Sequence, residues 1–173
     1  MKKLAFVAGM ILMLPLSVGA FTTVRWREHI KLGQTLEAAG IDILTNNQDC
    51  VDEPDAAGMY IPNRKQLVIC QSQAIVNNGK TVDFSEDDLD TLRHEAHHVL
   101  QDCLDGVIDG NMQPLFSSPE ARQGALSDED VKRIRNNYQM FNEHIIQLEI
   151  ETFNVANAVS AGVIAEGIER VCK

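Results

Sequence analysis

The sequence predicts an α+β fold in which a small β-sheet with an edge hairpin packs against one helix, and a second long helix completes the domain. Two apolar runs, residues 58–61 and 66–70, flank a four-residue turn, which is typical of a β-hairpin. Farther along, two serines are each followed by three acidic residues and then by helical apolar spacing, a pattern that marks helix N-termini. With 173 residues, 45% of them apolar and 23% charged, the chain has the size and composition of one globular domain.

The first twenty residues are predicted to be a secretory signal peptide (1–20), separate from the folded domain (21–173). Lys2 and Lys3 give a positive start, residues 4–16 are almost wholly apolar, and small residues lead up to Ala20. We expect cleavage after Ala20, with an uncleaved membrane anchor as the alternative. Because the apolar run is too short to span a bilayer, we expect a secreted or periplasmic protein with no stable membrane anchor after cleavage.

The charge balance argues against nucleic acid as a partner. Asp and Glu number 25 against 15 Lys and Arg, which gives a formal net charge of −10, and no basic block interrupts the chain. Phosphate backbones and anionic lipid surfaces repel such a chain.

All four cysteines follow the predicted cleavage point. An even count in an exported chain predicts disulfide bonds. Four cysteines allow three pairings, and the sequence does not choose among them. The pairing preferred here is Cys50 with Cys70 and Cys103 with Cys172. The first bond would close the hairpin region, and the second would tie the C-terminus to the central helix.

The N-terminal half of the domain contains the predicted sheet. Residues 25–39 have helical apolar spacing and end at Gly40, which favours a helix stop. Residues 41–44 form a short strand candidate, and the hairpin follows after a turn-rich acidic segment.

The C-terminal half is predicted to be helical. Ser85 caps a helix that we expect to reach about residue 104. Residues 105–126 are rich in Gly and Pro and are expected to form a long irregular loop, acting as a lid or a substrate wall. Ser127 begins helical spacing that continues to near residue 170, which is long for a globular helix, so we expect a break between residues 136 and 142.

His94, Glu95 and His98 form the pattern H-E-x-x-H within the first of these helices. Two histidines four residues apart lie one turn apart on a helix, so both imidazoles can bind one zinc ion. The intervening glutamate is placed to take a proton from a zinc-bound water. The opposite face of the helix is apolar, so we expect that face to pack on the sheet while the histidines face a cleft; the alternative is a surface helix with clustered histidines. The apolar positions are Leu89, Leu92, Ala96, Val99, Leu100 and Cys103. His97 is expected to be exposed or to support the site from behind, with replacement of a ligand as the alternative.

A catalytic zinc takes three protein ligands, so a third is expected downstream. Gln101 and Leu104 occupy the positions where a closely spaced third histidine would stand. On the long C-terminal helix, Glu149 borders the apolar stripe and is the preferred ligand. Glu151 points farther away and is the alternative ligand; otherwise we expect it to bind a ligand histidine by hydrogen bonding. The remaining alternative for both glutamates is a solvated helix face.

With these residues the chain resembles the gluzincin-type zinc metallopeptidases, in the compact form called minigluzincin. The resemblance implies a zincin-like fold and an exported metallopeptidase that hydrolyses peptide bonds in a peptide or protein substrate. Zn²⁺ would be held by His94, His98 and Glu149, and Glu95 would activate the zinc-bound water.

Three further expectations accompany the resemblance. Thr152 is the small residue that the family often places three positions after its glutamate ligand, whereas Phe153 departs from the Asp or Asn that often follows it. The resemblance also implies that the strand at residues 66–70 is the sheet edge that pairs with an extended substrate. Tyr138 and His144 are expected to pack at the helix interface, with stabilisation of the reaction's oxyanion as their alternative role.

A function of a different class is the alternative. The small domain is also compatible with a catalytically inactive zincin-like binding or inhibitory module that holds a structural zinc. Replacement of Glu95 by Gln would separate the two functions, because it would stop hydrolysis and leave binding of a partner intact.

Overall fold

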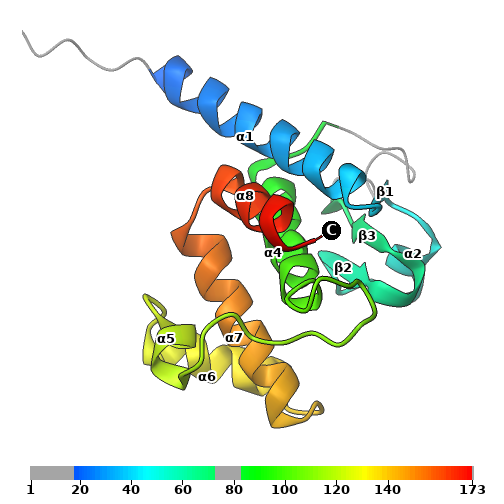
Figure 1. Ribbon diagram of the computed structural model, residues 1–173. Helices are drawn as coiled ribbons and strands as arrows, with labels where there is room; N and C mark the ends of the chain where they lie inside the picture. The colour runs from blue at the N-terminus through cyan, green and yellow to red at the C-terminus, as the bar shows by residue number, and fades with distance from the viewer. Residues whose placement is uncertain (1–17, 73–82, 173) are drawn as a thin grey trace, which may run out of the picture.

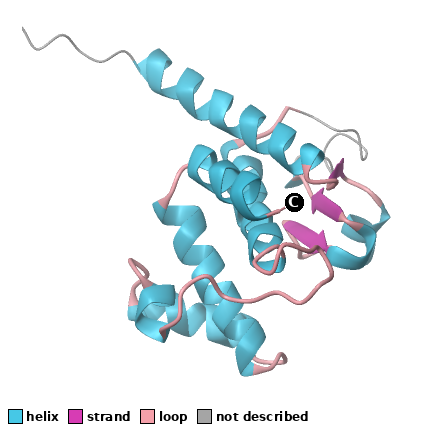
Figure 2. Ribbon diagram, in the orientation of Figure 1, coloured by secondary structure: helices cyan, strands magenta, loops and turns pink. Residues whose placement is uncertain are grey.

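The computed structural model describes residues 18–72 and 83–172, so most of the predicted signal peptide lies outside the described part. The fold is α+β and mostly helical, with a small sheet to one side of the helices (Figures 1 and 2). Its helices are α1 (Val18–Ala38), α2 (Gln48–Asp52), α4 (Glu86–Asp102), α5 (Pro119–Gln123), α6 (Asp128–Asn137), α7 (Glu143–Ala158) and α8 (Ala161–Val171).

The three described strands, β1 (Asp42–Thr45), β2 (Gly58–Ile61) and β3 (Gln66–Ile69), form a sheet in the order β1-β3-β2. The predicted hairpin is confirmed: β2 and β3 pair antiparallel through the 3-10 turn η1 (Pro62–Arg64) and Lys65, which has the left-handed backbone conformation.

The prediction that residues 66–70 form the sheet edge is wrong. β1 pairs parallel with β3 on the side away from β2, so β3 is the central strand and β2 is an edge. The side chains of Leu67, Val68 and Ile69 are fully buried. Such a continuous apolar run is typical of a strand covered on both faces, whereas an exposed edge favours alternation.

The main core lies where α4 meets α1, α8 and the sheet. The apolar face of α4 is buried as predicted, and α8 lies against both α1 and α4 (Figure 1). A capping box begins α4. The Ser85 side chain accepts a hydrogen bond from the Asp88 amide, and the Asp88 carboxylate accepts one from the Ser85 amide. This reciprocal pair satisfies two backbone donors that a helix end otherwise leaves free.

The helical run after Ser127 is broken twice. The first break follows α6 and lies in the predicted interval; Asn142 then caps α7 by accepting a hydrogen bond from the Ile145 amide. The second break, at Val159 and Ser160, was not predicted. Extended backbone at these two residues redirects the chain, so that α8 packs its apolar face on α1 and α4.

Both preferred disulfides are confirmed. Cys50 bonds to Cys70 and Cys103 bonds to Cys172. The second bond joins the C-terminal end of α4 to the end of α8. Disulfides of this kind are compatible with a secreted protein.

No helix within residues 18–72 and 83–172 combines the length and the apolar content that a membrane crossing requires.

Candidate metal centre

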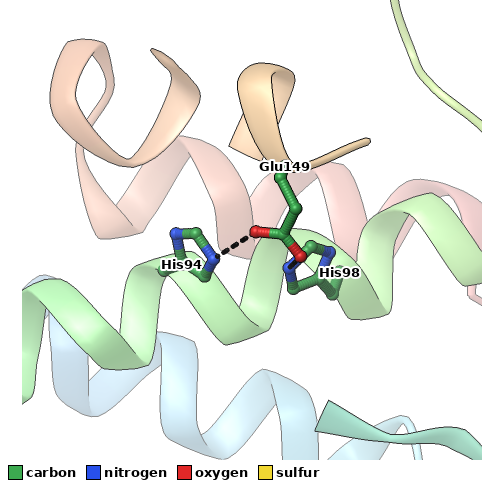
Figure 3. A group of neighbouring side chains, drawn as sticks. All are labelled: His94, His98 and Glu149. Carbon is green, nitrogen blue, oxygen red and sulfur yellow. Dashed lines mark ion pairs between the residues drawn. The ribbon is translucent and has the colours of Figure 1, made fainter. Parts of the chain in front are cut away.

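Two neighbouring helices bring His94, His98 and Glu149 together. The histidines lie one turn apart on α4, and the glutamate side chain reaches down between them from α7 (Figure 3). His94 Nε2 lies 3.3 Å from Glu149 Oε2, and His98 Nε2 lies 3.4 Å from Glu149 Oε1. One ligand atom from each residue falls within 4.8 Å of the others, so the group could hold a metal ion.

The separations fit a small cation with short bonds. Two ligand atoms that each lie about 2.0–2.1 Å from a tetrahedral zinc ion are roughly 3.3–3.4 Å apart. The distances between the histidine nitrogens and the Glu149 oxygens match that value. Glu149 Oε2 is also buried without a hydrogen-bond partner, although it faces His94. A buried carboxylate oxygen in this state is costly unless a cation or a donor satisfies it.

His98 is oriented by its neighbours behind the site. Its Nδ1 lies 2.8 Å from Gln101 Oε1, one turn farther along α4. Thr152 on α7 donates its hydroxyl to the Leu148 carbonyl and also lies 3.3 Å from Gln101 Oε1. With Nδ1 engaged in this way, Nε2 is the nitrogen that faces Glu149.

The pKa values of His98 and Glu149 are shifted in opposite directions. Burial would lower the pKa of His98, but the carboxylates of Glu149 and Glu95 beside it raise the pKa to about 9. Burial would raise the pKa of Glu149, but its contacts with the two histidines hold the pKa well below its usual range. The Glu149 carboxylate therefore favours positive charge on the neighbouring histidines. A bound divalent cation would supply that positive charge in place of a proton.

The side chain of Glu95, on α4, lies against the edge strand β2. Its pKa is raised, first by burial and also by the nearby Glu149, while the two histidines and the backbone amide of Tyr60 act in the opposite direction. Gly58 makes the close approach of β2 possible, because a Cβ atom there would lie 2.5 Å from Thr91 Cγ2 and 3.2 Å from Glu95 Cγ. Strand β2 and helix α4 are therefore in close contact at Glu95.

A cleft of about 320 Å³ opens beside this group. Residues before and at the start of β2 form one wall, and α4, α7 and the end of α6 form the others. Among the candidate ligands, His94 lines the cleft, so the cleft meets the group at that residue; Glu95 lines it as well, whereas His98 and Glu149 do not. The lining residues are Asp55, Ala56, Ala57, Gly58, Asp90, Thr91, His94, Glu95, Tyr138, Phe153, Ala156 and Asn157.

Two aromatic residues shape the cleft next to His94. The Phe153 ring meets the His94 ring edge to face, with centroids 4.5 Å apart. Tyr138 also lines the cleft, and its pKa is raised by burial and by the carboxylates of Glu149 and Glu95. His144 instead points to the Met112 carbonyl, at 2.9 Å from its Nε2. Of the two residues considered for oxyanion stabilisation, only Tyr138 lies at the cleft.

Glu151 is not part of the group and does not contact a candidate ligand histidine. Its fully buried carboxylate lies 3.2 Å from His97 Nε2 and accepts hydrogen bonds from the amides of Leu115 and Phe116. His97 is likewise fully buried, so the expectation of exposure is wrong and the supporting position is the correct one. The structure thus separates the two glutamates: Glu149 faces the histidines, and Glu151 faces the loop.

Residues 105–118, the part of the predicted irregular loop that precedes α5, are called the strap here. It is fastened at several points: Asp102 accepts hydrogen bonds from the amides of Asp109 and Gly110, and the Gln101 carbonyl accepts one from Gln113. The strap contributes none of the described residues that line the cleft. The expected lid or substrate wall is therefore, in this structure, a segment bound to the back of the site.

The sequence singles out His94, Glu95, His98 and Glu149, which the structure brings close together, but sequence reasoning missed the contact of Gln101 with His98. A signal was available, because residues three apart lie side by side on a helix and Gln101 stands three residues after His98. The cleft wall at residues 55–58 gave no such signal, since its position depends on strand pairing between distant segments.

The comparison with protein families identifies the chain at the family level. A family model described as Domain of unknown function (DUF8637) matches residues 21–172. The chain belongs to this family. No curated protein and no solved structure matches the chain. The matched segment contains the whole candidate metal centre, the cleft and the strap.

Proposed function

We propose that the protein is an exported zinc-dependent metallopeptidase of the gluzincin type, with a zincin-like arrangement of α4, α7 and the sheet. The observation that carries the proposal is the convergence of His94, His98 and Glu149 beside a cleft that His94 and Glu95 line. Two imidazoles and a carboxylate are a donor set found in catalytic zinc sites, which keep one position open. A peptide or protein is the proposed substrate.

Each residue has a distinct part in this proposal. His94, His98 and Glu149 would hold the ion, which when bound supplies the Lewis acidity that makes water a nucleophile near neutral pH. Glu95, with its raised pKa and its place on the cleft wall, would accept a proton from the attacking water and deliver it to the leaving amine. Tyr138 supplies a hydroxyl donor in the same cleft, where it is suited to stabilise the developing oxyanion.

The donor set also bears on which metal is bound. Imidazole ligands suit copper, iron and nickel as well as zinc. A carboxylate placed between the two histidines in the sequence is what a hydrolytic centre needs, because a base must accept the proton of the water. We therefore propose zinc, and elemental analysis of the purified protein distinguishes it from the other metals.

Metal content is the first test. The purified protein, with both disulfides formed and after equilibration with zinc and removal of excess metal, is analysed by elemental mass spectrometry beside His98→Ala. We expect about one zinc per chain in the wild type and far less in the variant, because two ligands and an open coordination sphere hold zinc weakly. A wild-type protein without bound metal would overturn the proposal.

Hydrolysis is the second test, and it separates the peptidase from an inactive zinc-holding module. Glu95→Gln preserves the shape of the side chain but removes its ability to accept a proton. We expect retained zinc and a loss of peptide hydrolysis of about 10²–10⁴-fold, the usual contribution of a general base. Equal hydrolysis by the two proteins would count against the mechanism, whereas zinc bound without any hydrolysis by the wild type would favour the binding module.

A further inference from the structure

A buried carboxylate joins the strap to the helices of the candidate metal centre. Glu151 Oε1 accepts hydrogen bonds from the Leu115 amide and from Gln101 Nε2, each at 2.9 Å. Its Oε2 accepts one from the Phe116 amide, also at 2.9 Å. Because the side chain has no exposed surface, these donors take the place of water around a charged group.

Gln101 contacts both Glu151 and His98. Its amide nitrogen donates to Glu151 and to the Leu148 carbonyl, and both of these partners are acceptors. The amide is therefore fixed in one orientation, with its oxygen 2.8 Å from His98 Nδ1. An oxygen at that place requires a hydrogen on Nδ1, which leaves Nε2 to bind a metal ion.

We propose that Gln101, held in place by Glu151, is a positioning residue that sets His98 for metal binding and couples the metal centre to the strap. The proposal rests on the proposed function, since it takes His94, His98 and Glu149 as metal ligands. Gln101 does not touch the ion; it acts through the imidazole. By reciprocity of linked equilibria, binding of the metal then stabilises the strap at Leu115 and Phe116.

The chain offers a matched control for this proposal. Asp102 is also a buried carboxylate on the same helix, and it also fastens the strap, through the amides of Asp109 and Gly110. Its other partner is the Tyr60 hydroxyl, at 2.7 Å, and none of these hydrogen bonds involves a candidate ligand. Asp102→Asn therefore weakens the attachment of the strap at Asp109 and Gly110, and leaves intact the hydrogen bonds that connect Leu115 and Phe116 through Glu151 to His98.

The primary experiment compares zinc affinities by competition with a chromophoric chelator, at fixed pH, for the wild type, Gln101→Met and Asp102→Asn. Methionine keeps the length of the side chain and removes both hydrogen-bonding groups. We expect Gln101→Met to bind zinc about 10–100-fold more weakly, the usual effect of losing a partner that orients a ligand. Asp102→Asn should bind zinc within about twofold of the wild type, even if it unfolds more easily.

Glu151→Gln gives an independent variant if Gln101→Met fails to fold. It keeps the shape of the side chain but places an NH₂ group against either the Phe116 amide or the Leu115 and Gln101 donors at Oε1, so at least one hydrogen bond to the strap is lost in either orientation. We expect weaker zinc binding here too, and a combined effect with Gln101→Met that is smaller than the product of the two, because they act on the same line.

Hydrogen exchange of the strap amides gives a readout that does not depend on activity. Zinc should slow exchange at Leu115 and Phe116 in the wild type, and should do so less in Gln101→Met. If the wild type binds zinc but Gln101→Met binds it equally well, or if Asp102→Asn weakens binding to the same extent, the inference is overturned and the proposed function stands. If the wild type binds no zinc, the proposed function is overturned and the inference with it.

Discussion

The two long faces of α4 are both buried, but they are buried by different means. One face carries only apolar side chains and packs into the core between α1, α8 and the sheet. The other carries Glu95, His97, His98, Gln101 and Asp102, which are buried among hydrogen-bond partners from α7, the strap and β2. The apolar face needs only removal from water, whereas each polar group needs a partner in a defined direction.

The comparison teaches where stability and function are separable. Burial of apolar area contributes roughly 25 cal/mol per Å² whatever the direction of the contact, so the apolar face should set the free energy of unfolding. Burial of charged groups is costly and is offset only by well-placed donors, acceptors or a cation, so the polar face should set metal affinity. Substitutions on the two faces should therefore move different observables.

The largest expected effect on the apolar face comes from the disulfide at its end. Replacing Cys103 and Cys172 together by Ala opens a loop with a sequence separation of 69 residues. We expect the free energy of unfolding to fall by about 4 kcal/mol, chiefly because the unfolded chain gains conformational freedom. Urea unfolding measures the change. A zinc affinity that stays close to the wild-type value in the folded variant would sharpen the comparison, and a large loss of affinity would break it.

The next effect is a cavity in the apolar face. Leu100 is buried against the core and faces away from the histidines, so Leu100→Ala should lower the free energy of unfolding by about 2–5 kcal/mol and leave zinc affinity nearly unchanged. Leu104, one turn farther along the chain and partly exposed, gives a control with the same chemical change. We expect Leu104→Ala to cost less than about 1 kcal/mol. Equal losses at the two positions would contradict the assignment of the faces.

Metal binding should reveal the stability that the polar face can contribute. With free zinc at about 100 times its dissociation constant, a site present only in the folded state raises the free energy of unfolding by about 2.7 kcal/mol. Thermal unfolding with and without a chelator measures this increment. Leu100→Ala should keep the increment and His98→Ala should lose it. An increment that survives in His98→Ala would place the stabilising metal elsewhere.

The same contrast explains what could be predicted from the sequence. The elements that depend on local signals agree with prediction: the hairpin, the two serine-capped helices and the apolar face of α4. The central position of β3 was missed because it depends on parallel pairing with β1, a contact between separate segments. The break at Ser160 was missed because the apolar spacing of the segment continues through it, and only packing of α8 on α1 shows why the chain must turn.

The candidate site divides in the same way. His94, Glu95 and His98 follow from spacing on one helix, which the sequence displays directly. The structure places Glu149, and not Glu151, beside the two histidines, although both glutamates are buried. Their different surroundings come from the strap, whose course over α7 no local pattern indicates. The supporting contacts of a site are therefore harder to predict than its histidines, because they come from segments that meet only in the folded chain.

The smallest expected effect tests the junction of the polar face with the sheet, where two glycines should respond in opposite directions. A Cβ on Gly58 would lie 2.8 Å from the Val68 carbonyl oxygen and 2.5 Å from Thr91 Cγ2, so β2 or α4 must shift. We expect Gly58→Ala to lower the free energy of unfolding by about 1–3 kcal/mol. Because Glu95 Cγ lies in the same contact, the proposed peptide hydrolysis should fall as well.

Gly33 is the matched control, since it lies within α1 and its nearest contact for an added Cβ is Ile43 Cδ1 at an ordinary 3.7 Å. Gly33→Ala should raise the free energy of unfolding by about 0.5–1 kcal/mol, because alanine restricts the unfolded chain and favours the helix. Urea unfolding of both variants measures the two signs. If Gly58→Ala were as well tolerated as Gly33→Ala, the close approach of β2 to Glu95 would not be required, and the cleft wall would have to be held by other contacts.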